Sequence, residues 1–245
     1  MRVPDPSRSP LDVVDLADVE VWRVGYRPEP WCWVDWRWAT GGRFNGRWDD
    51  AEGQFRTVYA GASLMACLVE LLVGFRPDPS VVAELDEIVE DDDDAALFPT
   101  APAGQLPRSW LDPRVAGTAL LDGRYCQITS MASIAALHMR FVALALGMGL
   151  GDFDAAALKD GRARALTQAV STRLYEIVLH DGHQLHGIEF LSRHGDDLKL
   201  WAVYERAGDA DVSPRISDRQ HVDLELDHPD LIAAMAVLGL EWATP

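Results

Sequence analysis

The most informative single residue of this sequence is Glu70. It lies in the segment 64–73, LMACLVELLV, whose other residues are all apolar or small. If this segment is a helix, it is apolar nearly all round, and the Glu70 carboxylate has little access to bulk water. A buried carboxylate without a partner is costly and shifts its pKa. We therefore expect Glu70 to have either a partner, for which a nearby arginine is the obvious candidate, or a role in chemistry. The alternative is a glutamate that reaches solvent at the helix edge.

Two arginines could supply the opposite charge. Arg23 lies in a short predicted strand, and Arg43 follows the glycine pair Gly41 and Gly42. Glycines let a backbone turn sharply and approach a ligand closely. A planar guanidinium that stays charged suits bidentate binding of a phosphate group. The alternative for Arg43 is a surface arginine beside a common glycine turn.

Aromatic residues gather in the same part of the chain. Six of the nine tryptophans lie between Trp22 and Trp48, and four of these lie in Trp31–Trp38. Tyr59 follows in a second predicted strand. Aromatic faces can stack on a base or a nicotinamide ring. The alternative is that these rings belong to a core strand or to a packing cluster beneath the arginine loop.

Metal and nucleophile chemistry have weaker signals. Three histidines recur at intervals of three residues (His180, His183 and His186), but Gly182 breaks any helix that would align them. The three cysteines (Cys32, Cys67 and Cys126) have no metal-ligand spacing, and we expect no metal site. An odd number of cysteines favours a reducing compartment. The first twenty residues carry acids and lack the apolar core of a signal peptide, so we expect a cytoplasmic protein.

The elements that must position these residues are mixed. Strands are predicted over Val21–Gly25, Thr57–Gly61, Gly187–Leu191 and Leu198–Glu205, the last two forming a hairpin with the loop Ser192–Asp197. Helices are predicted from the cap Ser63 to about Val73, and over Ser130–Leu146, Asp154–Lys159, Ala163–His180 and a last stretch from Asp227. Strands at both ends around a helical middle predict an α+β fold.

Charge narrows the class of ligand. The 245 residues carry 39 acidic and 22 basic side chains, a net charge of −17, which argues against a broad nucleic-acid surface. The acids concentrate in 80–98 and 207–245, whereas Val21–Arg76 holds seven arginines against six acids. The run Asp91–Asp94 is typical of a solvated loop. No apolar stretch is long enough to cross a bilayer, so we expect no membrane partner.

Taken in order, these segments resemble the RES domain family. The resemblance spans about residues 20–206 and rests on six stretches: VWRV around Arg23, GGRFN at 41–45, TVYAGAS at 57–63, ACLVE at 66–70, GIEFLSR at 187–193 and LWAVYE at 200–205. The family takes its name from an Arg, a Glu and a Ser, which here would be Arg23 or Arg43, Glu70 and Ser192. The usual Asn-Pro-Pro after the arginine motif is replaced by Asn45-Gly-Arg, which leaves the shape of that loop open.

The resemblance implies a fold similar to the ADP-ribosyltransferase toxins, a split β-sandwich with surrounding helices. It implies a leader over 1–19, an NAD-binding catalytic domain over 20–206 and an acidic extension over 207–245 that ends in a helix. RES proteins include toxins of bacterial toxin–antitoxin pairs that degrade NAD, with Xre-like antitoxins that occlude the cleft. By match to the family, five residues would line the NAD site: Arg23, Arg43, Tyr59, Glu70 and Ser192.

The implied chemistry suits these residue types. Glu70 would stabilise positive charge on the ribose as nicotinamide leaves, and the arginines would hold the pyrophosphate. Ser192 would hydrogen-bond a phosphate or the incoming nucleophile. Whether water, inorganic phosphate as a co-substrate or a protein side chain attacks stays open. The enzymatic alternative is a mono-ADP-ribosyltransferase, and the non-enzymatic one is a nucleotide- or partner-binding module; a homo-oligomer is compatible with either.

Overall fold

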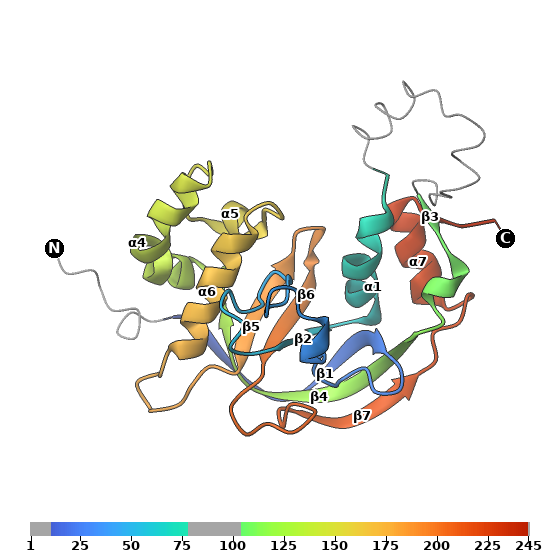
Figure 1. The fold of residues 1–245 in the computed structure, drawn as a ribbon, viewed down its shortest axis with the longest axis horizontal. Helices are drawn as coiled ribbons and strands as arrows, with labels where there is room; N and C mark the ends of the chain where they lie inside the picture. Colours follow the sequence, from blue (N-terminus) through green and yellow to red (C-terminus); the bar gives the residue numbers. More distant parts are fainter. Residues whose placement is uncertain (1–10, 78–103, 245) are drawn as a thin grey trace.

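The computed structural model of the chain describes residues 11–77 and 104–244. Within these residues the protein has an α+β fold in which strands from both halves of the chain form one large sheet. Two groups of helices stand above this sheet, one at each end of the molecule (Figure 1). The run Asp91–Asp94 lies outside the described residues.

Five strands close into a barrel-like ring and a sixth extends it. The order is β1-β2-β6-β5-β4-β7, and a further pairing of β1 with β4 completes the ring. All neighbours are antiparallel except β4 and β5, which are parallel. The strands are β1 (Val13–Tyr26), β2 (Thr57–Gly61), β4 (Arg114–Gln127), β5 (Gly187–Ser192), β6 (Gly195–Tyr204) and β7 (Ile216–Val222).

The first helix group, α4, α5 and α6, covers one end of the sheet, and α1 and α7 cover the other (Figure 1). The helices are α1 (Leu64–Leu72), α4 (Met131–Gly147), α5 (Ala155–Lys159), α6 (Arg164–Glu176) and α7 (Pro229–Leu238). The described residues also contain a short parallel pair, β3 (Gln105–Leu106) and β8 (Glu241–Trp242), and three 3-10 turns (Trp36–Trp38, Val73–Phe75 and Arg108–Trp110). Among the described residues, no helix is long and apolar enough to span a bilayer.

Helix α1 forms as its sequence predicts. The Ser63 side chain accepts a hydrogen bond from the Ala66 amide at 3.2 Å, which caps the first turn. The helix ends at Leu72, with Val73 as its C-terminal cap. Six of its nine residues are buried, because one side packs on the sheet and another on α7. This packing fixes the direction in which the partly exposed Glu70 points.

The central strand β4 was not predicted from the sequence. It is 14 residues long and pairs with β1 from Val13↔Cys126 to Tyr26↔Arg114, so β1 also begins well before the predicted Val21. Two glycines obscure the strand signal in β4. One of them, Gly117, lies where the Trp31 side chain approaches the backbone, since a Cβ there would be 2.8 Å from Trp31 Nε1. Glycine is therefore required at that point by packing on the strand.

Three other expectations differ from the structure. Helix α6 ends at Glu176 rather than near His180. The turn between β5 and β6 spans only residues 193–194, because β6 begins at Gly195. Trp31–Trp38 is an irregular segment with one 3-10 turn, and Trp31 and Trp33 are buried while Trp36 and Trp38 are exposed.

The C-terminal residues are integrated into the fold rather than appended to it. Strand β7 pairs with β4 in antiparallel register. Helix α7 packs against α1 in a core cluster that includes Leu68, Leu72, Leu231 and Met235. Residues 13–19, which the sequence places in a leader, belong to β1. The polypeptide after residue 206 thus supports the helix that carries Glu70.

Candidate functional site

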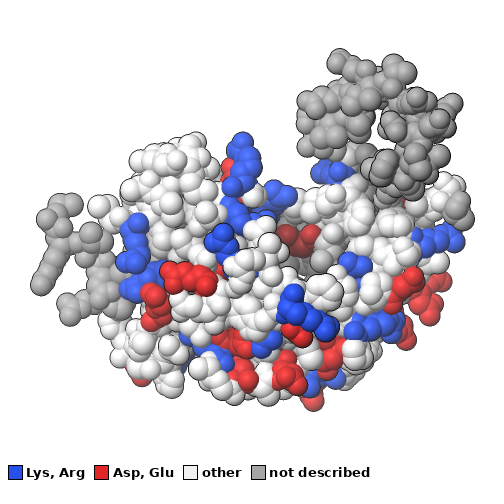
Figure 2. All heavy atoms as spheres, viewed as in Figure 1, with Lys and Arg blue, Asp and Glu red and all other residues white. Residues whose placement is uncertain are grey.

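A cavity of about 520 Å³ opens between the two helix groups. Its walls come from β1, β2, α1, β4, the start of α6, the β5–β6 turn and two loops. In the view of Figure 2, this face is hollowed between the helix groups, with acidic atoms inside the hollow and basic groups around it. The ionisable side chains of its wall, apart from Tyr26, Tyr59 and Cys67, are Arg23, Arg47, Glu70, Arg114, Arg164, Arg193 and His194.

Glu70 is held in the wall by the β5–β6 turn. The Ser192 hydroxyl donates a hydrogen bond of 2.5 Å to Glu70 Oε1, and the His194 amide donates one of 3.0 Å to Ser192 Oγ. Ser192 itself is fully buried and lies behind Glu70 rather than in the cavity wall. Its hydroxyl proton is committed to Glu70, so Ser192 orients the carboxylate and is not placed to attack a ligand.

Arg23 lines the cavity from β1, with two of its donors already used. Its Nε donates to the Pro30 carbonyl at 2.5 Å, and one terminal nitrogen donates to the Tyr59 carbonyl at 2.6 Å. Burial lowers the pKa of Arg23. No carboxylate of the described residues forms an ion pair with it. The guanidinium is thus a fixed positive charge that ties β1 to β2 beneath the cavity.

Tyr59 contributes a fixed ring to the wall. Its hydroxyl accepts a hydrogen bond from the Trp48 amide at 2.8 Å and donates one to Asp49 at 3.0 Å. Burial raises the pKa of Tyr59 well above its usual value, so the side chain stays a neutral phenol. Burial also raises the pKa of Asp49, although hydrogen bonds from Gly46 and Tyr59 oppose this. Because both sides of the hydroxyl are engaged, the ring rather than the hydroxyl is available to a ligand.

The loop arginine in the cavity is Arg47, not Arg43. Arg43 is exposed and donates to the Ala51 carbonyl at 3.3 Å. Gly41 and Gly42, with φ of 61° and 80°, turn the chain so that Arg43 points away from the cavity wall. The family resemblance implied that Arg43 and Glu70 line one site. The structure does not bring these two residues together.

Arg47 takes that place because its loop is anchored on both sides. Gln168 of α6 donates to the Gly46 carbonyl at 3.1 Å, and the Gly46 amide donates to the Asp49 carboxylate. A Cβ at Gly46 would lie 2.7 Å from the Tyr59 hydroxyl, so the close approach requires glycine. Burial lowers the pKa of Arg47, and the nearby Glu70 carboxylate partly reverses this.

Arg164 and Arg193 complete a cationic cluster beside Glu70. Both lower the pKa of Arg47, which shows that the three guanidiniums repel one another. Arg193 Nε donates to His194 Nε2 at 3.0 Å, which gives the His194 ring an acceptor role at that nitrogen. Burial and the neighbouring arginines lower the pKa of His194, whereas Glu70 raises it. The cluster is therefore arranged for an anion, and no carboxylate of residues 11–77 or 104–244 forms an ion pair with these arginines.

The charge balance of the cavity differs from that of the protein. Five arginines and one carboxylate line it, in a chain of net charge −17. None of the five arginines forms an ion pair with a carboxylate in residues 11–77 or 104–244. Elsewhere in that part of the chain, carboxylates pair with Arg27, Arg37, Arg56, Arg124, Arg162, Arg173, Arg215 and Arg219. The cavity arginines are thus available to a phosphate-bearing ligand.

Other residue types contribute little chemistry to the cavity. Burial raises the pKa of the Cys67 thiol to about 12, so it is not a thiolate near neutral pH. Among the described residues, no group of histidines, cysteines and acids is arranged to hold a metal ion. No tryptophan lines the cavity; from the segment Trp31–Trp38, only Val34 does.

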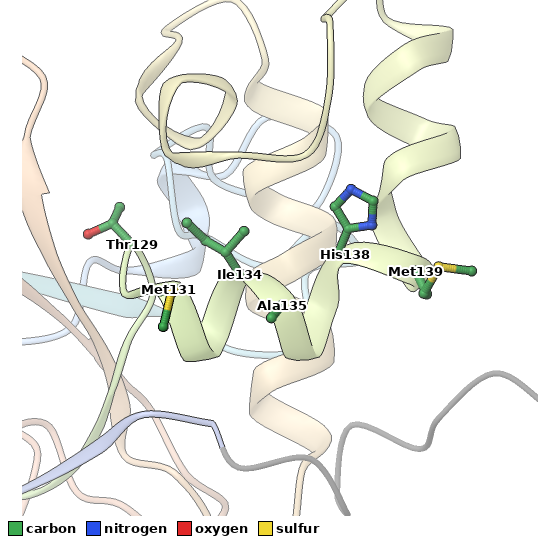
Figure 3. A pocket seen from close by; sticks show the side chains of 6 residues that line it. All are labelled: Thr129, Met131, Ile134, Ala135, His138 and Met139. Carbon is green, nitrogen blue, oxygen red and sulfur yellow. The ribbon is translucent and has the colours of Figure 1, made fainter.

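A larger hollow of about 640 Å³ lies on the outer face of α4 and has a different character. Figure 3 shows its labelled side chains on this helix, except Thr129, which lies on the loop just before it. The lining is mainly apolar, and its one ionisable residue, His138, contacts Asp152 at 2.7 Å. Because it lacks convergent polar groups, this surface is a poorer candidate for chemistry than the arginine-lined cavity.

Residues 20–135 match the family model described as the RES domain. A RES domain thus covers residues 20–135. No curated protein matches the chain. The matched part of the RES domain includes Arg23, Arg47, Tyr59 and Glu70, whereas Ser192 lies beyond it in sequence and reaches Glu70 through the fold.

Of the five cavity arginines, the sequence predicted only Arg23. The other four were missed, although the position of Arg164 at the start of a helix could have indicated a functional role. Arg164 lies in the first turn of α6, where the helix dipole disfavours a positive charge, and the N-cap Ala163 makes no side-chain cap. A cation in that position indicates a role other than helix stability. Arg193 directly follows Ser192 in the motif that pointed to the family. Arg47 and Arg114 carry no local signal, since only the tertiary fold brings them to the cavity.

Proposed function

We propose that the RES domain binds NAD in the arginine-lined cavity and cleaves the bond between nicotinamide and ribose. The observation that carries this proposal is the combination of five arginines, which form no ion pair within the described residues, and one carboxylate held in place by Ser192. NAD offers the matching chemistry, because it joins an anionic pyrophosphate to a cationic nicotinamide riboside. A site with arginines around a single carboxylate can bind both parts at once.

The arginine cluster would hold the pyrophosphate. Burial lowers the pKa of Arg47, and Arg193 and Arg164 lie close enough to lower it further by repulsion. A bound pyrophosphate would remove that repulsion and accept charge-assisted hydrogen bonds from several guanidiniums. Fixing the phosphates also fixes the ribose relative to Glu70, which lowers the entropic part of the barrier.

Glu70 would act on the ribose. As the bond breaks, its electron pair leaves with nicotinamide, which becomes neutral, and positive charge develops on the ribose carbon and ring oxygen. A carboxylate beside the ring stabilises that charge. Attack by water yields ADP-ribose and a proton, and attack by inorganic phosphate yields ADP-ribose 1-phosphate. Ser192 acts through Glu70 by holding one of its oxygens, which leaves the other for the ribose.

Tyr59 would provide a wall for the nicotinamide ribose rather than a proton. Its hydroxyl is engaged by Trp48 and Asp49, and its ring makes an edge contact with Phe190, with centroids 6.5 Å apart at 88°. Phe190 also lines the cavity. Two fixed aromatic rings of this kind exclude water from one side of the reacting carbon.

The biological setting follows from the family and is part of the same proposal. We infer that the barrel-like sheet and its helices form an ADP-ribosyltransferase-like fold and that residues 20–206 carry the catalytic function. The protein would act as an NAD-degrading toxin in the cytoplasm, with an Xre-like antitoxin as partner. A mono-ADP-ribosyltransferase remains the second candidate, because the same cavity serves if a protein side chain attacks the ribose.

Turnover of NAD by purified protein tests the proposal, with and without inorganic phosphate. Glu70→Gln keeps the size of the side chain and removes its charge, and we expect it to lower kcat by about 100- to 1000-fold. Glu225→Gln is the matched control, since Glu225 is exposed and lies outside the cavity. The proposal fails if wild-type protein leaves NAD intact both with and without phosphate. It also fails if Glu70→Gln and Glu225→Gln have the same kcat.

A further inference from the structure

The cavity wall also holds an aromatic–arginine stack, to which the proposed binding of pyrophosphate and cleavage of the ribose bond assign no specific role. Arg114 of β4 lies over the Trp110 ring, with 4.3 Å between the guanidinium carbon and the ring centroid, and over the Tyr26 ring at 5.3 Å. It also donates to the Trp110 carbonyl at 2.6 Å. Arg114 and Tyr26 both line the cavity, whereas Trp110 is buried behind them.

This stack lies apart from the Glu70 cluster. Glu70 raises the pKa of both Arg47 and His194. The pKa of Arg114 is instead lowered by burial and raised by Tyr26. Tyr26 and Arg23 are three residues apart on β1, about 10 Å along the strand. Arg114 is paired directly with Tyr26 in the sheet. The cavity therefore has two separate groups of polar side chains.

The Tyr26 ring is exposed, although Tyr26 ends a strand of the central sheet. Tyr26 is 63% exposed, although it lines a cavity and lies in a strand of the central sheet. Its backbone is held on both sides, because the Arg27 amide donates to the Pro113 carbonyl at 2.9 Å and Gly25 packs closely against Pro30. An aromatic ring with a fixed backbone and an open face loses little entropy when a flat ligand stacks on it.

We propose that Tyr26 and Arg114 form the adenine end of the site and make the protein specific for a dinucleotide over a nicotinamide mononucleotide. This inference rests on the proposed function, since it assigns the second half of the same substrate. The Tyr26 ring offers the adenine a stacking face, and the remaining N–H groups of Arg114 face the adenosine ribose or its phosphate. The aliphatic wall beside them is supplied by Val24, Leu71 and Val73.

Binding measurements on protein that cannot turn over substrate give the most direct test. In the Glu70→Gln background, calorimetric titrations of NAD, AMP and nicotinamide mononucleotide are compared with and without Tyr26→Ala. Loss of base stacking is expected to weaken NAD and AMP binding by about 5- to 100-fold. Binding of nicotinamide mononucleotide should not change. Tyr26→Phe keeps the ring and should retain the affinity for both adenine nucleotides.

The controls separate this inference from the proposed function. Trp38→Ala removes another exposed aromatic ring that does not line the cavity, and it should leave all three affinities unchanged. Equal affinities with and without the Tyr26 ring, or equal losses for all three ligands, would overturn the inference. If NAD binds through Tyr26 but wild-type protein does not consume it, the inference stands and the proposed reaction fails. If NAD does not bind at all, both fail.

Kinetics with the wild-type Glu70 provide a second readout. We expect Tyr26→Ala to raise the KM for NAD while kcat stays within about twofold, because the ring contacts the substrate far from the reacting bond. A fall in kcat with an unchanged KM would contradict the assignment. Thermal unfolding of each variant checks that the fold is retained; since Tyr26 is exposed, its loss should change Tm little.

Discussion

The hydroxyl of Ser192 donates a 2.5 Å hydrogen bond to the carboxylate of Glu70, across 122 residues of sequence. Glu70 extends from α1, and Ser192 ends β5, which lies two strands away from β2 in the sheet. The His194 amide holds the hydroxyl from the other side. A serine and a glutamate that lie far apart in the sequence therefore form one unit, in which the serine orients the carboxylate.

This unit predicts a specific kinetic effect. Ser192→Ala should lower kcat for NAD by about 10- to 100-fold, the cost of a hydrogen bond to a charged group, with KM nearly unchanged. Initial rates over a range of NAD concentrations measure the two constants separately. Ser217→Ala, on the exposed face of β7, is the matched control and should have no effect. A large rise in KM for Ser192→Ala would place the hydroxyl on the substrate instead.

The two loop arginines should behave differently. Arg47→Ala is expected to raise the KM for NAD by about 10- to 100-fold, because the half-buried guanidinium that we propose to hold the phosphates is lost. Arg43→Ala should stay within about twofold of wild type, since Arg43 is exposed and outside the cavity wall. The two residues are four apart in one loop, so each variant serves as the control for the other. The reverse order of effects would show that the loop rearranges to bring Arg43 inward.

Gly161 is predicted to be essential for the position of Arg193. A Cβ at Gly161 would lie 2.2 Å from an Arg193 terminal nitrogen, so alanine must displace the guanidinium. The displaced group is the end of a flexible side chain, and Gly161→Ala should therefore weaken NAD binding several-fold with little change in Tm. Gly151→Ala, where nothing lies within 4 Å, is the control. Calorimetry and thermal unfolding distinguish this outcome from a general loss of stability.

His186 predicts how stability depends on pH. Burial and the neighbouring arginines lower the pKa of His186 to about 4, from about 6.5 in the unfolded chain. The unfolded state therefore binds a proton first as pH falls, and stability present above pH 6.5 is lost between about 6.5 and 4. Between pH 7.5 and 5 this group should contribute a loss of about 2 kcal/mol.

Denaturant unfolding at the two pH values measures that loss. His186→Asn should be less stable at pH 7.5, because His186 Nδ1 accepts a hydrogen bond from the Arg124 amide at 2.9 Å. It should also show a smaller difference between the two pH values than wild type. His221→Asn, at an exposed site, should retain the wild-type difference. An unchanged pH dependence in His186→Asn would show that other groups control it.

The sequence predicts those parts of the site whose signals are local. The cap at Ser63, the apolar run and the single acid within it are sufficient to predict α1 and to single out Glu70. The strand that carries Tyr59 and the hairpin that carries Ser192 have similarly clear alternation. Their contacts with one another were not predictable in detail, because they depend on the order of strands in the sheet.

The misassigned parts depend on tertiary packing. Strand β4 lacks a clear pattern because Gly117 makes room for Trp31. The choice between Arg43 and Arg47 is decided by Gln168, a residue of α6 that holds the loop from more than 100 positions away. Arg114 reaches the cavity only because β4 pairs with β1. These contacts join residues far apart in the sequence, so they cannot be predicted from the residues next to either partner.

The central claim is that this cavity breaks the bond between nicotinamide and ribose. The most direct measurement is the mass of the products that purified wild-type protein forms from NAD, with phosphate absent or present. Without phosphate, we expect free nicotinamide and ADP-ribose in equal amounts. With phosphate, we expect free nicotinamide and ADP-ribose 1-phosphate in equal amounts. Intact NAD at the end of the reaction, or the pair AMP and nicotinamide mononucleotide from cleavage at the pyrophosphate, would contradict it.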